Sequence, residues 1–266
     1  MKLSVENGPD FVRLMKRYSV DYTASHDQSV TLDIMEPDYA LIMGPHRIVG
    51  RDEQYFAATR KQMDQFPGLG FTVHELHTTG ERLVMRFSEH GASLRHGGRQ
   101  CAWEGIGLYA WNGKRLISNH VEQDYFSRSA QLNSGVANPV EPPAVAPWDT
   151  VAVAGDKEAE GLVEQWLHAG GLSTTENVVC DDAWTGASVE RIAEQTGLTI
   201  NDLFSCGATV AFHVAQHGRL LPGFSSNPAH AGKNVSLYAA GLVHVRDGAI
   251  VSGRVIRNRL ELQRSL

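Results

Sequence analysis

The chain contains 266 residues, of which 24 are basic and 30 are acidic, so its formal net charge is −6. This balance argues against nucleic-acid binding, which needs a clustered excess of lysine and arginine, and no apolar window approaches the roughly 20 residues that span a bilayer. Hydrophobic residues make up 42% of the chain, so we expect a globular protein with a packed core and no nucleic-acid or membrane partner.

The cysteines and the first residues indicate the compartment. Cys101, Cys180 and Cys206 are odd in number and far apart, which argues against a disulfide framework. Residues 1–11 lack the apolar stretch of a secretory signal peptide. Both features predict a reducing, cytoplasmic location.

The first part of the chain is predicted to form helices and a short hairpin. Apolar residues at helical spacing predict a first helix over 10–25. A short helix that carries Ile34 and a hairpin over 39–46 follow, and a second long helix begins near Arg51 and ends before Pro67.

Four strands complete this unit. Alternating apolar and polar residues, bounded by turn signals, predict strands over 70–79, 82–93, 100–111 and 114–125. Helices followed by an antiparallel sheet predict an α+β fold, in which the helices pack on one face of a curved sheet.

A proline-rich segment divides the chain. Residues 133–150 contain four prolines, and this density removes backbone donors and favours an extended chain. We therefore expect a linker over 133–150, between a first domain over 1–132 and a second domain over 151–266.

The two domains resemble each other. The apolar strands at 105–111 and 240–246 run into Asn-Gly and Asp-Gly, which are strong hairpin signals. The strands at 83–91 and 210–218 both end in His-Gly. We expect the second domain to be a degenerate copy that packs its sheet against the first, as an intramolecular pseudo-dimer. The sequence leaves further homo-oligomerisation open.

The order of these elements, together with four short motifs, resembles the SnoaL-like branch of the nuclear transport factor 2 (NTF2) superfamily. The motifs are Pro37-Asp38-Tyr39, Val49-Gly50-Arg51-Asp52-Glu53, His90-Gly91 and Asn112-Gly113-Lys114. The resemblance implies two cone-shaped NTF2-like (cystatin-like) α+β barrels, each with a deep apolar pocket. It also implies chemistry that is mostly cofactor-free, as in polyketide cyclases, isomerases, dehydratases, epoxide hydrolases and carbon–carbon lyases.

The strand over 82–93 carries the first candidate catalytic residues. Side chains alternate between faces, so Arg86 and His90 share a polar face, opposite Met85 and Phe87. We predict that His90 moves a proton while the guanidinium of Arg86 stabilises an oxyanion. The alternative is an exposed polar face of an edge strand.

The last strand of the first domain supplies two acids, Glu122 and Asp124, on one face. The resemblance implies a catalytic carboxylate near this position, where it would orient or charge His90. The alternative is a solvated face or a salt bridge across an interface. The second domain has Arg257 and Arg259 at the corresponding positions, and these arginines could face partner carboxylates.

Aromatic residues are dense near the expected pocket, although a plain core role is the alternative for each of them. The resemblance implies that Tyr22, on the first helix, places its hydroxyl on a substrate oxygen. Further substrate contacts are expected from His46, Trp103, Tyr39, Tyr55 and Tyr109.

No metal or cofactor is expected. His213 and His217 have the spacing of a helical zinc motif, but the glutamate of that motif is missing and the repeat places both on a strand. The sequence also lacks a glycine-rich nucleotide loop and a nucleophile elbow.

These features predict a cofactor-independent lyase (a dehydratase or a carbon–carbon lyase), isomerase or cyclase. Its substrate would be a hydrophobic small molecule, a bulky apolar or aromatic compound with hydroxyl or carbonyl groups. A limonene-type epoxide hydrolase would need an Asp-Arg-Asp set, which Arg86 with Glu122 or Asp124 could imitate. The remaining alternative is a non-catalytic binding or assembly module.

Overall fold

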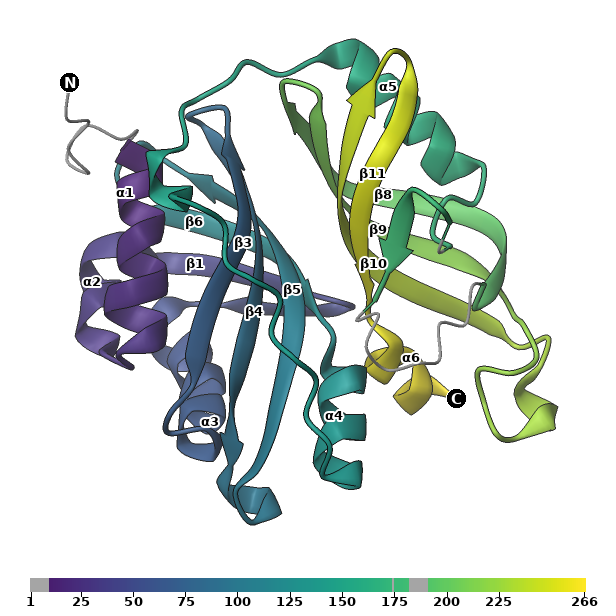
Figure 1. Cartoon of the computed structure of the whole chain (residues 1–266), viewed down its shortest axis with the longest axis horizontal. Coiled ribbons are helices and arrows are strands. Elements are labelled where there is room, and N and C mark those ends of the chain that lie inside the picture. Colours follow the sequence, from purple (N-terminus) through teal and green to yellow (C-terminus); the bar gives the residue numbers. More distant parts are fainter. Residues whose placement is uncertain (1–9, 174, 182–190) are drawn as a thin grey trace.

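The computed structural model describes residues 10–173, 175–181 and 191–266. Figure 1 shows two α+β units side by side, the first in purple to teal and the second in green to yellow. Each unit is a curved sheet with helices packed on it, which confirms the predicted α+β class. Within these residues, no helix is both long enough and apolar enough to cross a membrane.

The first sheet has six strands in the order β2-β1-β6-β5-β4-β3. Neighbouring strands are antiparallel except for β1 and β6, which pair in parallel. The strands are β1 (Met35–Met43), β2 (His46–Val49), β3 (Gly70–Thr78), β4 (Arg82–Ser93), β5 (Arg99–Trp111) and β6 (Leu116–Gln123).

Helices cover one face of this sheet. The helix predicted over 10–25 is present but changes from α to π geometry at Arg17. Its residues Phe11 and Met15 pack in the same core as Met85 and Phe87. The helical segments are α1 (Asp10–Lys16), the π-helix η2 (Arg17–Ala24), the 3-10 helix η3 (Gln28–Val30), α2 (Thr31–Ile34), the π-helix η4 (Arg51–Tyr55), α3 (Phe56–Gln65), the 3-10 helix η5 (Leu94–His96) and α4 (Tyr125–Ser134).

The second sheet has five strands in the order β7-β11-β10-β9-β8, with β7 and β11 in parallel. One long helix covers it, and Val163 and Leu167 of this helix pack against Phe212 and Val243. The elements are α5 (Lys157–His168), β7 (Val178–Cys180), β8 (Ala193–Cys206), β9 (Thr209–Leu220), β10 (Asn234–Arg246), β11 (Ala249–Arg257) and α6 (Arg259–Ser265).

The described part of the second unit contains fewer helices and strands than the first unit. In the described residues it has no counterpart of the β1–β2 hairpin or of α3.

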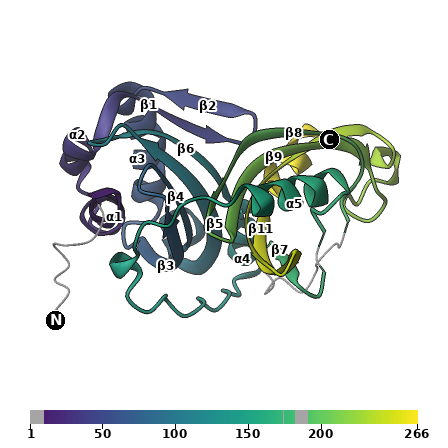
Figure 2. The same ribbon diagram turned by 90° about the horizontal axis from the view of Figure 1, so that it is seen from above.

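The two sheets pack face to face, and Figure 2 shows them meeting in the middle of the molecule. Val84, Ile106 and Leu108 of the first sheet form one buried cluster with residues of the second, including Leu242 and Ile256. The side chains on this face of β4 and β5 are therefore buried between the units. The opposite face, under the helices, is the one that can enclose a cavity.

The segment between the two sheets lies along the edge strand β3. The N–H of Ala144 donates to the carbonyl of Val73 at 2.8 Å, and the N–H of Val153 donates to the carbonyl of Thr78 at 2.9 Å. The 3-10 helix η6 (Pro147–Asp149) interrupts this extended segment. Because the segment satisfies part of an open sheet edge, it protects that edge as well as connecting the units.

Candidate functional site

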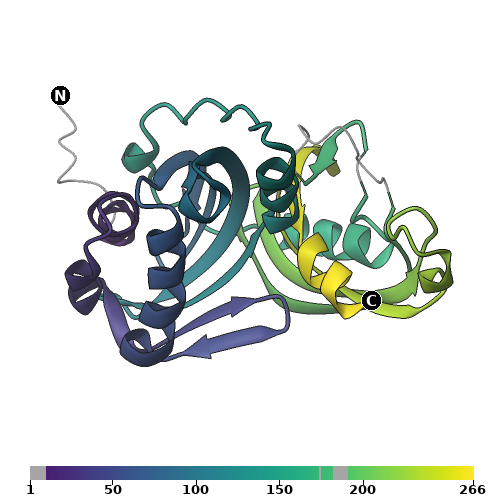
Figure 3. The same ribbon diagram turned by 90° about the horizontal axis from the view of Figure 1, so that it is seen from below.

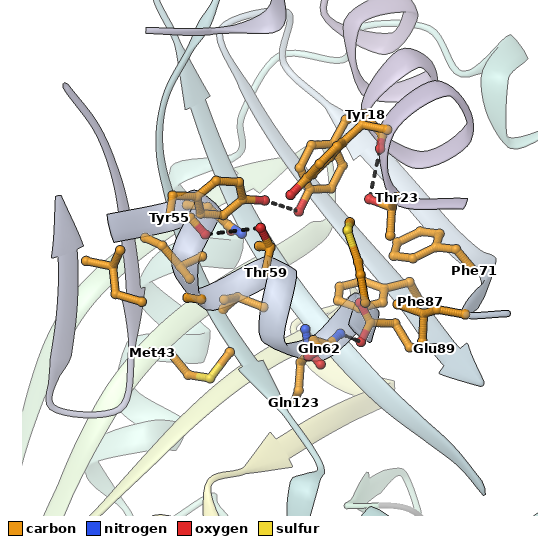
Figure 4. A pocket seen from close by; sticks show the side chains of 18 of the residues that line it. Tyr18, Thr23, Met43, Tyr55, Thr59, Gln62, Phe71, Phe87, Glu89 and Gln123 are labelled. Carbon is orange, nitrogen blue, oxygen red and sulfur yellow. Dashed lines mark hydrogen bonds between the residues drawn. The ribbon is translucent and has the colours of Figure 1, made fainter. Parts of the chain in front are cut away.

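A cavity of about 190 Å³ lies in the first unit, between α3 and the helix-covered face of the six-stranded sheet (Figure 4). Its strand residues alternate along the chain, for example Leu41 and Met43 on β1, and Val121 and Gln123 on β6. Side chains two residues apart share a face, so these strands present one continuous lining. A mainly apolar cavity with a few polar groups is typical of a small-molecule site.

Four tyrosines form one wall of this cavity. Tyr18 and Tyr22 reach it from the π-helix η2, Tyr55 from the end of the π-helix η4, and Tyr109 from β5. The ring centroid of Tyr18 lies 5.7 Å from those of both Tyr22 and Tyr109. π-helical turns are rare and often mark functional sites, because they redirect side chains that an α-helix would space differently.

The hydroxyl groups of this wall are buried and remain protonated at neutral pH. Burial raises the pKa of Tyr18, Tyr55 and Tyr109 far above neutrality. The hydroxyls of Tyr18 and Tyr55 lie 3.4 Å apart, within weak hydrogen-bond distance. The hydroxyl of Tyr22 is buried, which raises its pKa, and Thr59 and Tyr55 lie close enough to oppose that shift, but it makes no hydrogen bond of good geometry with the described residues. It is thus a donor available to a bound molecule.

Glu89 is the one carboxylate among the described residues that line the cavity. It continues the inward face of Met85 and Phe87 along β4, and its side chain is 5% exposed. Burial raises its pKa to about 7, against the smaller opposing effects of the Arg128 charge and the hydrogen bond from Gln62. A carboxyl group of this kind changes protonation near neutral pH.

Gln62 of α3 holds the carboxylate in place. Its Nε2 donates to Glu89 Oε2 at 2.6 Å, and its Oε1 accepts from the hydroxyl of Tyr125 at 3.2 Å. The guanidinium of Arg128 lies 3.9 Å from the centroid of the Tyr125 ring. This chain of contacts orients the amide so that its donor faces Glu89 (Figure 4).

Three of the predicted site residues line the cavity, namely Tyr22, Tyr55 and Tyr109. Two predicted aromatic contacts lie behind the lining. Tyr39 is buried against Tyr55, with ring centroids 5.2 Å apart. Trp103 is buried near Glu89, and its Nε1 donates to the side chain of Gln123 at 2.8 Å. His46, the first residue of β2, has an exposed side chain.

His90 lies on the other face of β4 from Glu89 and is outside the cavity lining. Its Nε2 is 3.3 Å from the hydroxyl of Thr72. The ring occupies the space above Gly70, where a Cβ would lie 2.1 Å from Cε1 of His90. Partial burial lowers the pKa of His90. The structure therefore does not bring this imidazole to the cavity, because the alternation of β4 turns it away.

Arg86 points toward the second unit. Its Nη1 and Nη2 donate to the two oxygens of Glu141 at 2.9 and 3.0 Å, and its Nε donates to Glu75 at 2.9 Å. Arg254 of β11 donates to the same Glu141 carboxylate at 3.3 Å. The Arg86 hydrogen bonds hold the pKa of Glu141 at about 2. Arg86 thus joins β4 to the inter-unit segment and lies away from the cavity.

Glu122 likewise forms contacts between the two units. Its carboxylate is fully buried and accepts from the N–H of Gly44, from His213 Nε2 and from Asn258 Nδ2, at 2.7, 2.9 and 2.7 Å. These contacts correspond to the alternative of an interface salt bridge, here between two halves of one chain.

Asp124 also has a structural role, as a helix cap and in an ion pair. The strand predicted over 114–125 ends earlier, at Gln123, because Asp124 caps α4 and accepts from the N–H of Ser127 at 3.0 Å. It also pairs with Arg259 of α6. Neither predicted acid lines the cavity.

Glu89, Gln62 and Tyr18 were not among the predicted site residues. For Glu89 the signal was present in the sequence, since alternation places it on the same face as Met85 and Phe87. A carboxylate at the end of an otherwise apolar strand face indicates a buried acid. Gln62 and Tyr18 had no comparable signal, because polar and aromatic residues are common on helices.

No metal site is visible in the part of the chain that the structure describes, where no three His, Cys, Asp or Glu side chains gather suitably. His213 and His217 both lie on β9, in agreement with the strand predicted there. His213 contacts Glu122, and His217 Nδ1 is 2.9 Å from the hydroxyl of Ser236.

No family model matches the chain, and no curated protein matches it. Solved structures do match one half of it. A protein from Jannaschia sp. CCS1, described as a SnoaL-like polyketide cyclase, is 19% identical, with 48% of this chain and 92% of that chain covered and a TM-score of 0.42. TsrD from Streptomyces laurentii is 20% identical, with 46% and 93% covered and a TM-score of 0.41.

IdmH from Streptomyces antibioticus, described as a polyketide cyclase, is 16% identical, with 46% of this chain and 96% of that chain covered and a TM-score of 0.41. The SnoaL-like proteins that the sequence resembles are therefore also among the structures that match. These likenesses concern the arrangement of helices and strands only.

Proposed function

We propose that this chain is a cofactor-independent enzyme that transfers a proton on an uncharged, mainly apolar ring compound with a carbonyl or hydroxyl group. One observation carries the proposal: Glu89 is buried in an aromatic cavity, where its pKa is raised to about 7. A carboxyl group with such a pKa accepts a proton when it is ionised and returns it when it is protonated, at one and the same pH.

The proposed step is the formation of an enolate. The proton leaves a carbon next to the substrate carbonyl and passes to a Glu89 oxygen, while the electron pair of the C–H bond moves toward the carbonyl oxygen. The Tyr22 hydroxyl donates a hydrogen bond to that oxygen, and burial raises its pKa so that it stays protonated. A donor already placed where charge develops stabilises the transition state.

The lining indicates the class of substrate. Among the described lining residues there is no lysine, arginine or histidine. A substrate carboxylate or phosphate would therefore be buried without a counter-charge, which is costly. The rings of Tyr18, Phe71 and Phe87 and the side chains of Met43 and Met63 suit a flat apolar body.

Several reactions begin with this proton transfer. Return of the proton to another carbon gives an isomer, expulsion of a neighbouring hydroxyl gives a dehydration, and addition of the enolate to a second carbonyl gives a ring. Cleavage of a carbon–carbon bond needs the same base and the same oxyanion donor. Limonene-type epoxide hydrolysis is less well supported, because Arg86, the arginine of the required set, points away from the cavity.

The test is proton exchange in heavy water. The full chain is incubated with a series of cyclic ketones, and loss of the α-proton signal is followed by NMR. We expect exchange in the wild type and a loss of about 10²–10⁴-fold in Glu89→Gln, as is typical for removal of a general base. Glu164→Gln, on the exposed side of α5, is the matched control and retains the wild-type rate.

Two results would contradict the proposal. An unchanged exchange rate in Glu89→Gln would remove Glu89 from the reaction. Binding of the ketones without any exchange in the wild type would favour the non-catalytic binding module instead.

A further inference from the structure

The tip of the β1–β2 hairpin touches the second unit. Figure 3 shows the hairpin extending toward α6, the last helix of the chain. At the turn, Gly44 has a φ of +55° and donates its N–H to Glu122 Oε1 at 2.7 Å. His46 Nε2 lies 3.4 Å from Glu261 Oε2 of α6. The hairpin therefore ends on side chains from both halves of the chain.

One side chain joins these contacts. Asn258 caps α6, since its Oδ1 accepts from the N–H of Glu261 at 3.1 Å. Its Nδ2 donates at 2.7 Å to Oε2 of Glu122, the carboxylate that holds Gly44. A Cβ on Gly44 would lie 3.0 Å from this Nδ2, so the amide lies over the turn and leaves no room for a side chain there. Asn258 thus connects the start of α6, the buried carboxylate and the hairpin.

The hairpin forms one wall of the cavity. Leu41, Met43 and Ile48 line the cavity from its two strands. Strand β2 is a four-residue strand at the edge of the sheet, and its ladder partner is β1. Short edge elements with few contacts open more readily than central strands. The position of this wall therefore depends on what holds the turn.

We propose that Asn258 is a positioning residue, which holds the hairpin turn against α6 and thereby sets the cavity wall made by Leu41 and Met43. The proposal rests on the proposed function in one respect, namely that the cavity binds substrate. In this way the second unit shapes the site without lining it. Capping α6 needs only the Oδ1 acceptor of Asn258, so the Nδ2 donor that reaches Glu122 is not explained by the cap.

Two substitutions test this role from opposite sides. Asn258→Ser separates the two functions of the side chain, because serine also caps helices but is too short to reach Glu122. Gly44→Ala adds a Cβ against Asn258 at a positive φ, which disturbs the same contact from the hairpin. Asn227→Ser is the matched control, since Asn227 caps the 3-10 helix η8 (Pro228–His230) through the N–H of Ala229 at 3.1 Å.

Amide hydrogen exchange over 38–49 measures the hairpin without any ligand. We expect exchange there to become faster by about tenfold or more in Asn258→Ser and Gly44→Ala, and to stay unchanged in Asn227→Ser. Wild-type exchange in Asn258→Ser would overturn the proposal.

Binding of 2-naphthol, followed by its fluorescence, measures the wall. We expect its Kd to rise about tenfold in both hairpin variants and to keep the wild-type value in Asn227→Ser. Faster exchange with an unchanged Kd would overturn the proposal, because the wall would then not matter to the ligand. If the wild type binds no 2-naphthol, the proposed function loses support, and exchange at Leu41 and Met43 still decides whether Asn258 holds the wall.

Discussion

The two faces of strand β4 carry buried charge in different ways. On the face toward the second unit, Arg86 bonds Glu75 and Glu141, and the pKa of Glu141 is held at about 2. On the face toward the cavity, Glu89 has the amide of Gln62 as its partner, and burial raises its pKa to about 7. At Glu141 the two hydrogen bonds from Arg86 keep the carboxylate charged, whereas the buried Glu89, with a neutral amide as its partner, can exchange a proton.

The largest expected effect comes from removing the Arg86 ion pairs on the face of β4 toward the second unit. In Arg86→Met, Glu75 loses its guanidinium partner and Glu141 keeps only the longer contact with Arg254, so the free energy of unfolding should fall by about 3–5 kcal/mol. Urea unfolding followed by tryptophan fluorescence measures this change. Arg47→Met, at an exposed position of β2, is the control and should change stability by less than about 0.5 kcal/mol.

The same variant also tests whether the two faces of β4 act independently. Proton exchange per folded molecule of Arg86→Met should equal that of the wild type, because Arg86 lies on the face away from the cavity. A loss of stability below about 1 kcal/mol would show that the ion pairs behave as ordinary surface pairs.

The pH dependence of the free energy of unfolding tests the raised pKa of Glu89 on the cavity face. The pKa of Glu89 is raised from 4.5 to about 7, so between these values the folded state holds a proton that the unfolded state has lost. The free energy of unfolding therefore falls as the pH rises through this window, by roughly 3 kcal/mol in total. Glu89→Gln has no carboxyl group at this position and so lacks this pH dependence. Its free energy of unfolding should therefore rise relative to that of the wild type between pH 5 and pH 8.

Unfolding of both proteins at the two pH values measures this difference. Glu104, a second buried acid with a raised pKa, is present in both proteins and cancels from the comparison. A wild-type-to-variant difference that is the same at both pH values would mean that Glu89 titrates normally.

A smaller effect is expected from the tyrosine wall. Tyr22→Phe removes the hydroxyl donor but keeps the ring, and should slow α-proton exchange roughly tenfold. Tyr39→Phe is a close control, because its hydroxyl is likewise buried without a hydrogen-bond partner among the described residues but lies outside the lining. Equal rates in the two variants would argue against a role for Tyr22 at the substrate oxygen.

The smallest expected effect concerns Arg128, whose charge opposes the raised pKa of Glu89. Arg128→Gln should move the midpoint of the pH–rate profile upward by less than about one unit. Arg60→Gln, on an exposed part of α3, should leave the midpoint in place. A downward shift would contradict the sign of this interaction.

Much of the fold followed from local patterns. The alternation of the strand over 82–93 correctly separated Met85 and Phe87 from Arg86, and the Asn-Gly and Asp-Gly signals marked real turns between strands. The same patterns predicted the α+β class. Of the predicted site residues, Tyr22, Tyr55 and Tyr109 line the cavity, the first two from the helical layer and the third from β5.

The order of residues along each strand is enough to assign which of them share a face, because side-chain direction depends only on the local backbone. It did not determine which face encloses the cavity, because that depends on which one the second unit covers. Likewise, the partners of Glu122 are Gly44, His213 and Asn258, at separations of 78, 91 and 136 residues. Contacts over such distances arise only when the chain has folded, so the tertiary structure alone decided that Glu122 is structural and that Glu89 faces the cavity.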